Sequence, residues 1–142
     1  MTVLSITTHR SIRATTAATL LLGTLGLAAI PAPAASADLD NLLSQYRAAA
    51  DSDFSAARGQ QLFMRNYGER SCSVCHTDDP RNPGKHQKTG KPIEPLAPSA
   101  NPKRLTDQRE MTKWLLRNCK WTLERECSAQ EKGDFLTWLR EQ

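Results

Sequence analysis

The pentapeptide Cys72-Ser73-Val74-Cys75-His76 is the stretch around which the rest of the chain is organised. Its C-x-x-C-H spacing is typical of covalent haem attachment. Cysteines three residues apart lie one helical turn from each other, so both sulfurs can add to the vinyl groups of one porphyrin. The imidazole that follows directly is placed to bind the iron from the proximal side. The motif predicts one haem c, bound through Cys72 and Cys75, with His76 as an axial ligand.

Other uses of closely spaced cysteines fit the sequence less well. A redox dithiol is typically found in a βαβ context, and the residue pattern indicates no convincing strands. A structural zinc site needs four ligands at zinc-finger spacings, whereas Cys119 and Cys127 are eight residues apart with no histidine beside them. A disulfide inside the motif leaves His76 without a role. Haem attachment is the interpretation that uses all three residues of the motif.

The N-terminal residues predict an export signal. A basic start precedes an apolar run over residues 17–30, and Ala35-Ser36-Ala37 forms an A-x-A cleavage site. The run is too short to cross a membrane, although an uncleaved anchor is the alternative. We therefore expect a signal peptide at residues 1–37, cleaved near Ala37, and one periplasmic domain over residues 38–142.

The expected mature domain is small and nearly neutral. The 19 Lys and Arg of the chain fall to 17 without Arg10 and Arg13, against 15 Asp and Glu. This balance does not indicate a nucleic-acid partner, because nucleic-acid binding usually requires a strongly basic face. A domain of this length has only a marginal core of side chains, so a covalent haem would add apolar bulk.

Two cysteines remain once Cys72 and Cys75 are assigned to haem. They are Cys119 and Cys127, and in an oxidising compartment we expect them to form a disulfide. The loop that this disulfide closes is short, and the chain-entropy model gives roughly 2–3 kcal/mol of stabilisation.

Two helices are predicted before the motif. Residues 38–50 carry Leu39, Leu42, Leu43 and Tyr46 on one face, which is typical of an outer helix that leans on the domain. Asp51, Ser52 or Asp53 would cap a second helix over residues 54–66. That second helix contains Gly59, a residue that costs about 1 kcal/mol in a helix interior and is better explained by the close approach of another backbone.

The last segment, residues 128–142, supplies a partner for Gly59. Ser128 and Glu131 form a capping-box pattern that starts a helix with Phe135 and Trp138. A first and last helix of this kind around C-x-x-C-H resemble the class I cytochrome c fold. The resemblance matches that family's glycine and aromatic to Gly59 and Phe63, and its C-terminal pair to Phe135 and Trp138. It implies an all-α domain around one haem, with an extra N-terminal helix and a disulfide-tied hairpin.

The middle of the chain, residues 76–106, contains six prolines and little periodicity. A loop of that length is uncommon in a compact domain unless it wraps something. We expect Ile93, Pro95 and Leu96 to contact the porphyrin. The basic run 85–91 and the pair Lys103-Arg104 would either reach the propionates or remain in solvent.

The function depends on the residue opposite His76. Thr106 would cap a helix over residues 107–118 whose inner face carries Met111, Trp114, Leu115 and Asn118. Met111 is the obvious ligand by type, but a methionine in a helix stripe is more often core. Met64 and His86 are weaker candidates. Asn118 is the last residue of that inner face and directly precedes Cys119. An amide on the buried side without a hydrogen-bond partner would cost free energy.

Several segments resemble a more specific group, the sphaeroides haem protein family of high-spin, oxygen-binding cytochromes c. The likeness covers nearly the whole mature chain and is carried by Thr89-Gly90-Lys91, Pro95-Leu96-Ala97-Pro98-Ser99-Ala100, Arg104-Leu105-Thr106-Asp107, Lys113-Trp114-Leu115, Arg117-Asn118-Cys119 and Cys127. In that family an asparagine beside the disulfide is the distal ligand of the oxidised protein. The resemblance implies that role for Asn118.

The chemistry of an amide ligand indicates the expected function. An amide oxygen is a hard, weak donor that suits ferric iron and suits ferrous iron poorly, so reduction should release it. A ferrous site could then bind O2 or NO, with the amide N–H groups available as donors. We expect a gas-binding cytochrome that receives electrons from a multihaem or membrane cytochrome. The alternative is a His76 and Met111 electron carrier, and an oxygen or NO reductase ranks last.

Overall fold

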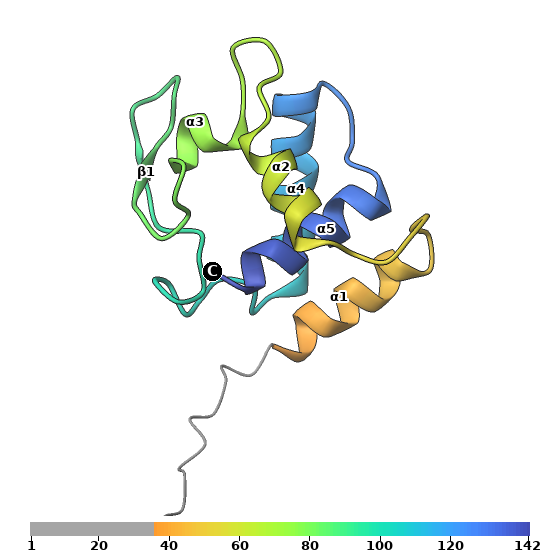
Figure 1. The fold of residues 1–142 in the computed structure, drawn as a ribbon. Helices are drawn as coiled ribbons and strands as arrows, with labels where there is room; N and C mark the ends of the chain where they lie inside the picture. The colour runs from red at the N-terminus through yellow and green to blue at the C-terminus, as the bar shows by residue number, and fades with distance from the viewer. Residues whose placement is uncertain (1–35) are drawn as a thin grey trace, which may run out of the picture. The chain divides into compact units, whose positions relative to one another are not determined.

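The computed structural model describes residues 36–142, so all but the last two residues of the expected signal peptide lie outside it. The described chain contains α1 (Ala37–Arg47), α2 (Ala56–Met64), α3 (Cys72–His76), β1 (Gly84–Lys85), β2 (Pro92–Ile93), α4 (Gln108–Leu123) and α5 (Ala129–Arg140) (Figure 1). The strands pair antiparallel, with Gly84 opposite Ile93. The expected all-α class is confirmed, because this small hairpin is the only sheet among the described residues. Within them, no helix is long and apolar enough to cross a membrane.

The centre of the fold is the crossing of α2 and α5. A Cβ atom on Gly59 would lie 2.8 Å from the Cβ of Trp138, so the helices are in direct contact there. Phe63 is fully buried, with its ring centroid 4.8 Å from that of Trp138 and 6.3 Å from that of Phe135. The predicted pairing of the first and last class I helices is therefore confirmed. It provides one wall for the site described below.

The start of α2 differs from the sequence expectation. Ser55, rather than a residue of 51–53, is the N-cap, and its side chain accepts a hydrogen bond from the Arg58 N–H. Phe54 precedes the helix and packs against Gly133 of α5, where a Cβ atom would lie 2.1 Å from the phenyl ring. The tertiary contact of Phe54 draws it out of the helix, so the helix starts two residues later.

A buried carboxylate joins α2 to α5. Asp134 is 3% exposed and accepts hydrogen bonds from the Ser55 N–H at 2.7 Å, from Arg58 Nε at 2.7 Å and from Gln130 Nε2 at 3.0 Å. Burial raises the pKa of Asp134, but these donors, with Arg58 foremost, outweigh burial and hold the pKa below its usual value. The acid is thus ionised and satisfied beside the helix crossing.

α1 is part of the core rather than an outer support. Leu39 and Leu42, at 1% and 2% exposure, form a cluster with Met111 of α4 and Leu136 of α5. The apolar stripe predicted for this helix is the face that packs here. α1 therefore holds α4 and α5 together from below the α2 crossing in the view of Figure 1.

α4 is longer than predicted and starts one residue later. Asp107 caps it, accepting from the Glu110 N–H, so the expected Thr106 cap is wrong by one residue. The helix does not end at Asn118 but continues to Leu123, and Glu124 then terminates it in the left-handed region at φ 59°. The buried face continues through Cys119 and Thr122, which are 6% and 2% exposed. Asn118 consequently lies inside a continuous helix, and it is exposed rather than buried as the sequence pattern predicted.

Candidate haem site

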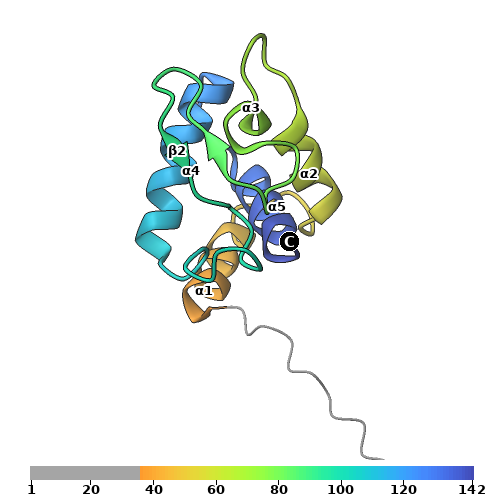
Figure 2. The same ribbon diagram turned by 90° about the vertical axis from the view of Figure 1, so that its left-hand side faces the viewer.

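A cavity of about 1010 Å³ lies between α3 and α4, with residues of α2, α5 and the segment 92–96 also on its walls. Pockets for cofactors and drug-sized ligands span roughly 300–1,000 Å³, so this one is at the upper end of the range. Figure 2 looks onto the side of the fold where the hairpin crosses in front of these helices. Cys72, Cys75 and His76 from the motif and Asn118 from α4 all line it.

The motif forms α3, a helix of five residues with its own cap. The Ser71 hydroxyl accepts a hydrogen bond from the Val74 N–H at 3.1 Å, and Ser71 is only 1% exposed. This cap fixes the first turn, which places Cys72 and Cys75 one turn apart at the cavity wall. The sequence motif and its local structure therefore agree.

The hairpin is pressed against the end of α3. A Cβ atom on Gly84 would lie 2.0 Å from the Cys75 carbonyl oxygen and 3.0 Å from the His76 Cα, so only glycine fits there. The Gln87 N–H donates to the Cys75 sulfur at 3.3 Å. The backbone of residues 84–87 thus sets the position of the motif's second cysteine and its histidine. Sequence reasoning missed this role of Gly84.

Burial governs the electrostatics of the motif. Burial lowers the pKa of His76 to about 4, and the positive charge of Arg104 adds to the effect. His76 is therefore neutral at pH 7, which is the form that binds a metal. Burial raises the pKa of the Cys72 thiol to about 11, although a hydrogen bond with Thr122 opposes the rise. Two free cysteines, a neutral imidazole and apolar walls are the donor set that haem c requires.

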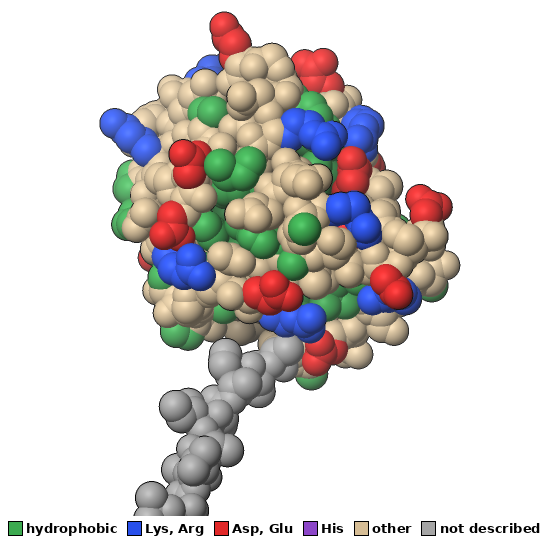
Figure 3. Space-filling view, viewed as in Figure 1, with side chains coloured by type: hydrophobic (Ala, Val, Ile, Leu, Met, Phe, Trp, Pro, Cys, Tyr) green, Lys and Arg blue, Asp and Glu red, His purple; other side chains and the backbone are tan. Residues whose placement is uncertain are grey.

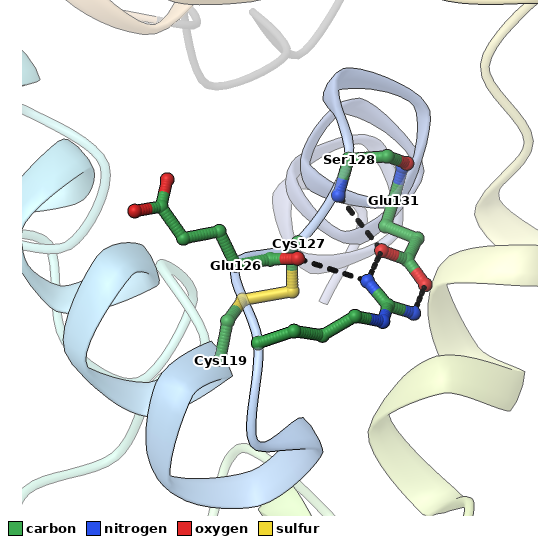
Figure 4. The surroundings of a disulfide bond; sticks show 6 residues. Cys119, Glu126, Cys127, Ser128 and Glu131 are labelled. Atoms are coloured by element: carbon green, nitrogen blue, oxygen red, sulfur yellow. Dashed lines mark hydrogen bonds and ion pairs between the residues drawn. A yellow bond between two sulfur atoms is a disulfide. The ribbon is translucent and has the colours of Figure 1, made fainter.

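The expected disulfide between Cys119 and Cys127 is present, with a Cα–Cα distance of 5.6 Å. It joins the last turns of α4 to the residue before the Ser128 cap of α5 (Figure 4). Glu131 completes the predicted capping box by accepting from the Ser128 N–H at 2.8 Å. The Arg125 guanidinium forms two bonds of 2.7 Å to the same carboxylate and a third to a backbone carbonyl beside Cys127. The connection between α4 and α5 is therefore held in place by the disulfide and by the contacts of Arg125.

The four residues considered as distal ligands lie in different surroundings. Asn118 lines the cavity from α4, and Met111 lines it seven residues earlier while also filling the cluster with Leu39 and Leu42. Met64 is 39% exposed and is not on the cavity wall. His86 does line the cavity, which the sequence did not indicate, and its Nδ1 accepts the backbone N–H groups of residues 88 and 89 at 3.3 and 3.2 Å.

The residues expected to contact a porphyrin are only partly those on the wall. Ile93 and Leu96 line the cavity, whereas Pro95 does not and Pro92 takes its place. Lys103 and Arg104 are both on the wall. The Arg104 guanidinium donates to the carbonyl oxygens of Pro95 at 2.8 Å and of residue 94 at 3.0 Å. These two backbone carbonyls therefore hold the positive charge of Arg104 at the cavity wall.

Trp114 also lies on the cavity wall. The sequence pattern did not predict this role for it. It precedes Asn118 by one helical turn and lines the cavity. Its Nε1 donates to Glu110 at 3.0 Å, and the guanidinium carbon of Arg117 lies 5.1 Å from its ring centroid. The signal was the i, i+4 spacing from Trp114 to Asn118, which was assigned to the core.

Comparisons with known proteins identify relatives of this chain. A family model described as "Domain of unknown function (DUF1924)" matches residues 49–139. Cytochrome c-type protein SHP of Cereibacter sphaeroides is 41% identical in an alignment of 117 positions that covers 79% of this chain and 90% of that protein. The solved structure of oxidised SHP, described as an oxygen-binding cytochrome c, has a TM-score of 0.68 and 42% identity over 73% of this chain and 96% of that one.

A second solved relative is cytochrome c'' of Methylophilus methylotrophus. Its solution structure, described as giving insights into haem-ligand detachment, has a TM-score of 0.64 and 31% identity. That match covers 74% of this chain and 94% of the relative. Both relatives are c-type cytochromes with the helical arrangement seen here.

The fold, the cavity and these relatives define a c-type cytochrome with a class I-like helical fold, and its cofactor is haem c. Within that class, the chain belongs to the family of the sphaeroides haem protein SHP, and it also matches the DUF1924 family model.

Proposed function

We propose that the chain is a periplasmic, gas-binding monohaem cytochrome in which Asn118 is a labile distal ligand. Haem would be attached through Cys72 and Cys75, with His76 on the proximal side. The observation that supports the proposal is that these four residues, from two separate helices, line one cavity. The oxygen-binding description of the relative SHP supports the choice of a gas as ligand.

Haem c supplies an iron that accepts one electron and, when ferrous, can bind O2 or NO. The chain's own residues determine when that binding is possible. The Asn118 side-chain oxygen is a hard donor suited to the ferric state, and it is a poor partner after reduction. Its N–H groups then become available as hydrogen-bond donors toward a small ligand in the cavity.

His76 serves as the constant ligand in this proposal. Its neutral state at pH 7 keeps one ring nitrogen free for the iron. The close contact of Gly84 with the Cys75 carbonyl and the His76 Cα holds the backbone of His76 in place. The proximal side would therefore stay fixed while the distal side changes.

The second candidate function is electron transfer with Met111 opposite His76. The observation in its favour is that Met111 also lines the cavity. Against it, Met111 is 8% exposed and forms part of the α1 cluster, where a move toward the iron would open a gap beside Leu39. An oxygen or NO reductase would need, in addition, a proton-donating group placed beside the bound ligand.

Visible spectra of three holoproteins test the ligand assignment: the wild type, Asn118→Ala and Met111→Leu. We expect Asn118→Ala to change the ferric spectrum and Met111→Leu to preserve it. A sulfur-to-iron charge-transfer band in the wild type that survives Asn118→Ala and disappears in Met111→Leu would reject the amide ligand. Rapid CO binding by the ferrous wild type is the matching test of an open site, and a closed, CO-inert ferrous form would favour the carrier.

A further inference from the structure

The two cysteine sulfurs of the motif each have one hydrogen-bonding partner outside the motif, and the two partners come from different elements. The Cys75 sulfur accepts from the Gln87 N–H at 3.3 Å, in the turn between β1 and β2. The Cys72 sulfur shares a hydrogen bond with the Thr122 side chain, in the last turn of α4. The attachment helix α3 is therefore joined through one sulfur to the hairpin and through the other to α4.

Thr122 is a buried polar residue on the cavity wall, with an exposed fraction of 2%. The other buried hydroxyl among the described residues is that of Ser71, which caps α3 by accepting from the Val74 N–H. A hydroxyl that is removed from water costs free energy unless it has a hydrogen-bond partner. For Thr122 that partner is the Cys72 sulfur.

The position of Thr122 in α4 gives this contact its meaning. Thr122 follows Asn118 by one helical turn, and both residues line the cavity. The hydroxyl of a helical threonine has an alternative acceptor in the carbonyl oxygen four residues earlier, here that of Asn118. In the structure the hydroxyl bonds to Cys72 instead. Thr122 thus links α4 to α3 and does not turn back onto its own helix.

Covalent attachment of haem fixes the direction of this hydrogen bond. When the Cys72 sulfur adds to a vinyl group, its S–H bond breaks, a sulfur–carbon bond forms and the hydrogen passes to the neighbouring vinyl carbon. The resulting thioether sulfur has no hydrogen and can only accept. The Thr122 hydroxyl must then be the donor, with its hydrogen directed at a sulfur that is bonded to the porphyrin.

A donor at this sulfur draws electron density from the porphyrin. Hydrogen bonds around a haem are one means by which a protein sets the reduction potential, and a hydrogen bond is electrostatically stronger in a buried site than in water. Charges on the surface are screened by salt, and acidic and basic side chains are interspersed on the face shown in Figure 3. The buried Thr122 hydroxyl escapes this screening, and it favours the electron-rich ferrous state.

We propose that Thr122 is a positioning residue that donates a hydrogen bond to the Cys72 thioether sulfur, ties α4 to the attached haem and raises the reduction potential. The inference goes beyond the proposed function. It requires only that haem is attached at Cys72, and it is independent of the residue that lies opposite His76.

Three variants of the holoprotein test the role of the hydroxyl. Thr122→Val keeps the shape of the side chain and removes the hydroxyl, whereas Thr122→Ser keeps the hydroxyl and removes the methyl group. Thr112→Val is the matched control, because it makes the same change in the same helix at an exposed residue that does not line the cavity.

Two measurements are made on each holoprotein. Spectroelectrochemistry gives the reduction potential. NMR of the ferric form gives the resonances of the cysteine β-protons, which lie next to the thioether sulfurs. The Cys75 protons are an internal reference, because the Gln87 N–H that bonds to the Cys75 sulfur is the same in all the variants.

We expect Thr122→Val to lower the reduction potential, so that the ratio of ferric to ferrous protein at the wild-type midpoint rises about threefold, as loss of a weak hydrogen bond would give. The Cys72 β-proton resonances should move while those of Cys75 stay in place. Thr122→Ser should restore the wild-type potential and resonances, and Thr112→Val should leave both unchanged.

Three results would overturn the proposal. The first is an unchanged potential in Thr122→Val. The second is an equal shift in Thr122→Ser, which would assign the effect to packing. The third is a shifted potential with unaltered Cys72 resonances, which would show that the hydroxyl acts elsewhere, as on the Asn118 carbonyl. A methionine-ligated spectrum in the wild type would refute the proposed function alone, because the comparison of Thr122 variants does not depend on the distal ligand.

Discussion

A Cβ atom on Gly59 would lie 2.1 Å from the carbonyl oxygen of Asp134, so α2 and α5 meet backbone to backbone at this point. Because the obstructing atom belongs to a helix backbone, it cannot rotate away. We expect Gly59→Ala to separate the helices and to lower the free energy of unfolding by about 1–3 kcal/mol, as overpacking does in other cores. Denaturant titration of the holoprotein measures the change.

Gly133 provides the matched control for Gly59. A Cβ atom there would meet the ring of Phe54, which is a side chain outside any helix and can turn. Gly133→Ala should therefore cost less than Gly59→Ala, and the smaller residue in Phe54→Leu should recover part of the loss in the double variant. If Gly59→Ala is as stable as the wild type, the backbone contact is not what limits this crossing.

Gly84→Ala should impair the site more than the fold. The added methyl group would push residues 84–87 away from the Cys75 carbonyl and the His76 Cα. We expect a lower yield of haem-containing protein and a perturbed ferrous spectrum, measured per mole of purified chain. Lys85→Ala is the control, because Lys85 is exposed and lies next in the same strand. A Gly84→Ala protein with wild-type haem content and spectrum would contradict the role assigned to the hairpin.

Asp134 should make stability depend on pH in the acid range. Its donors hold the pKa below the unfolded value, which is about 3.9, so its contribution is complete above that pH and is lost as the pH falls through the lower folded pKa. Asp134→Asn should lower stability at pH 7 by about 1–3 kcal/mol and flatten the acid limb of the stability profile. The exposed Asp53 offers a control, since Asp53→Asn should leave both unchanged. An unaltered acid limb in Asp134→Asn would be inconsistent with this account.

Cys119→Ser/Cys127→Ser tests the disulfide as a brace for α4. The chain-entropy model gives a loss of roughly 2–3 kcal/mol in unfolding free energy. If Asn118 is the distal ligand, the ferric spectrum should also change, because the end of its helix would no longer be tied to α5. A double variant with reduced stability but an unchanged ferric spectrum would show that the disulfide does not position the distal ligand.

Local patterns in the sequence were sufficient for the central features. Three features were predicted correctly: the capping box at Ser128, the glycine and aromatic spacing at Gly59 and Phe63, and the pairing of Cys119 with Cys127. Each depends on residues whose physical role is narrow: a backbone acceptor, a missing side chain, a pair of thiols. Such residues leave few alternative interpretations.

Features that depend on distant contacts were not predictable in the same way. The end of α4 was placed too early because Cys119 and Thr122 continue its buried face without being typical apolar residues. Thr106 and Asp107 are both good caps, so their order could not be decided locally. The contact of Gly84 with Cys75 requires the folded chain.

The continuity of α4 also limits how Asn118 could bind and leave the iron. A residue on a loop can leave the iron by a backbone rearrangement lasting microseconds or longer, but Asn118 is followed by five more helical residues and a disulfide. Movement of Asn118 away from the iron would then require a rotation of its side chain and no rearrangement of the helix backbone. The side chain of Asn118 would therefore change its position while the backbone of α4 stays in place.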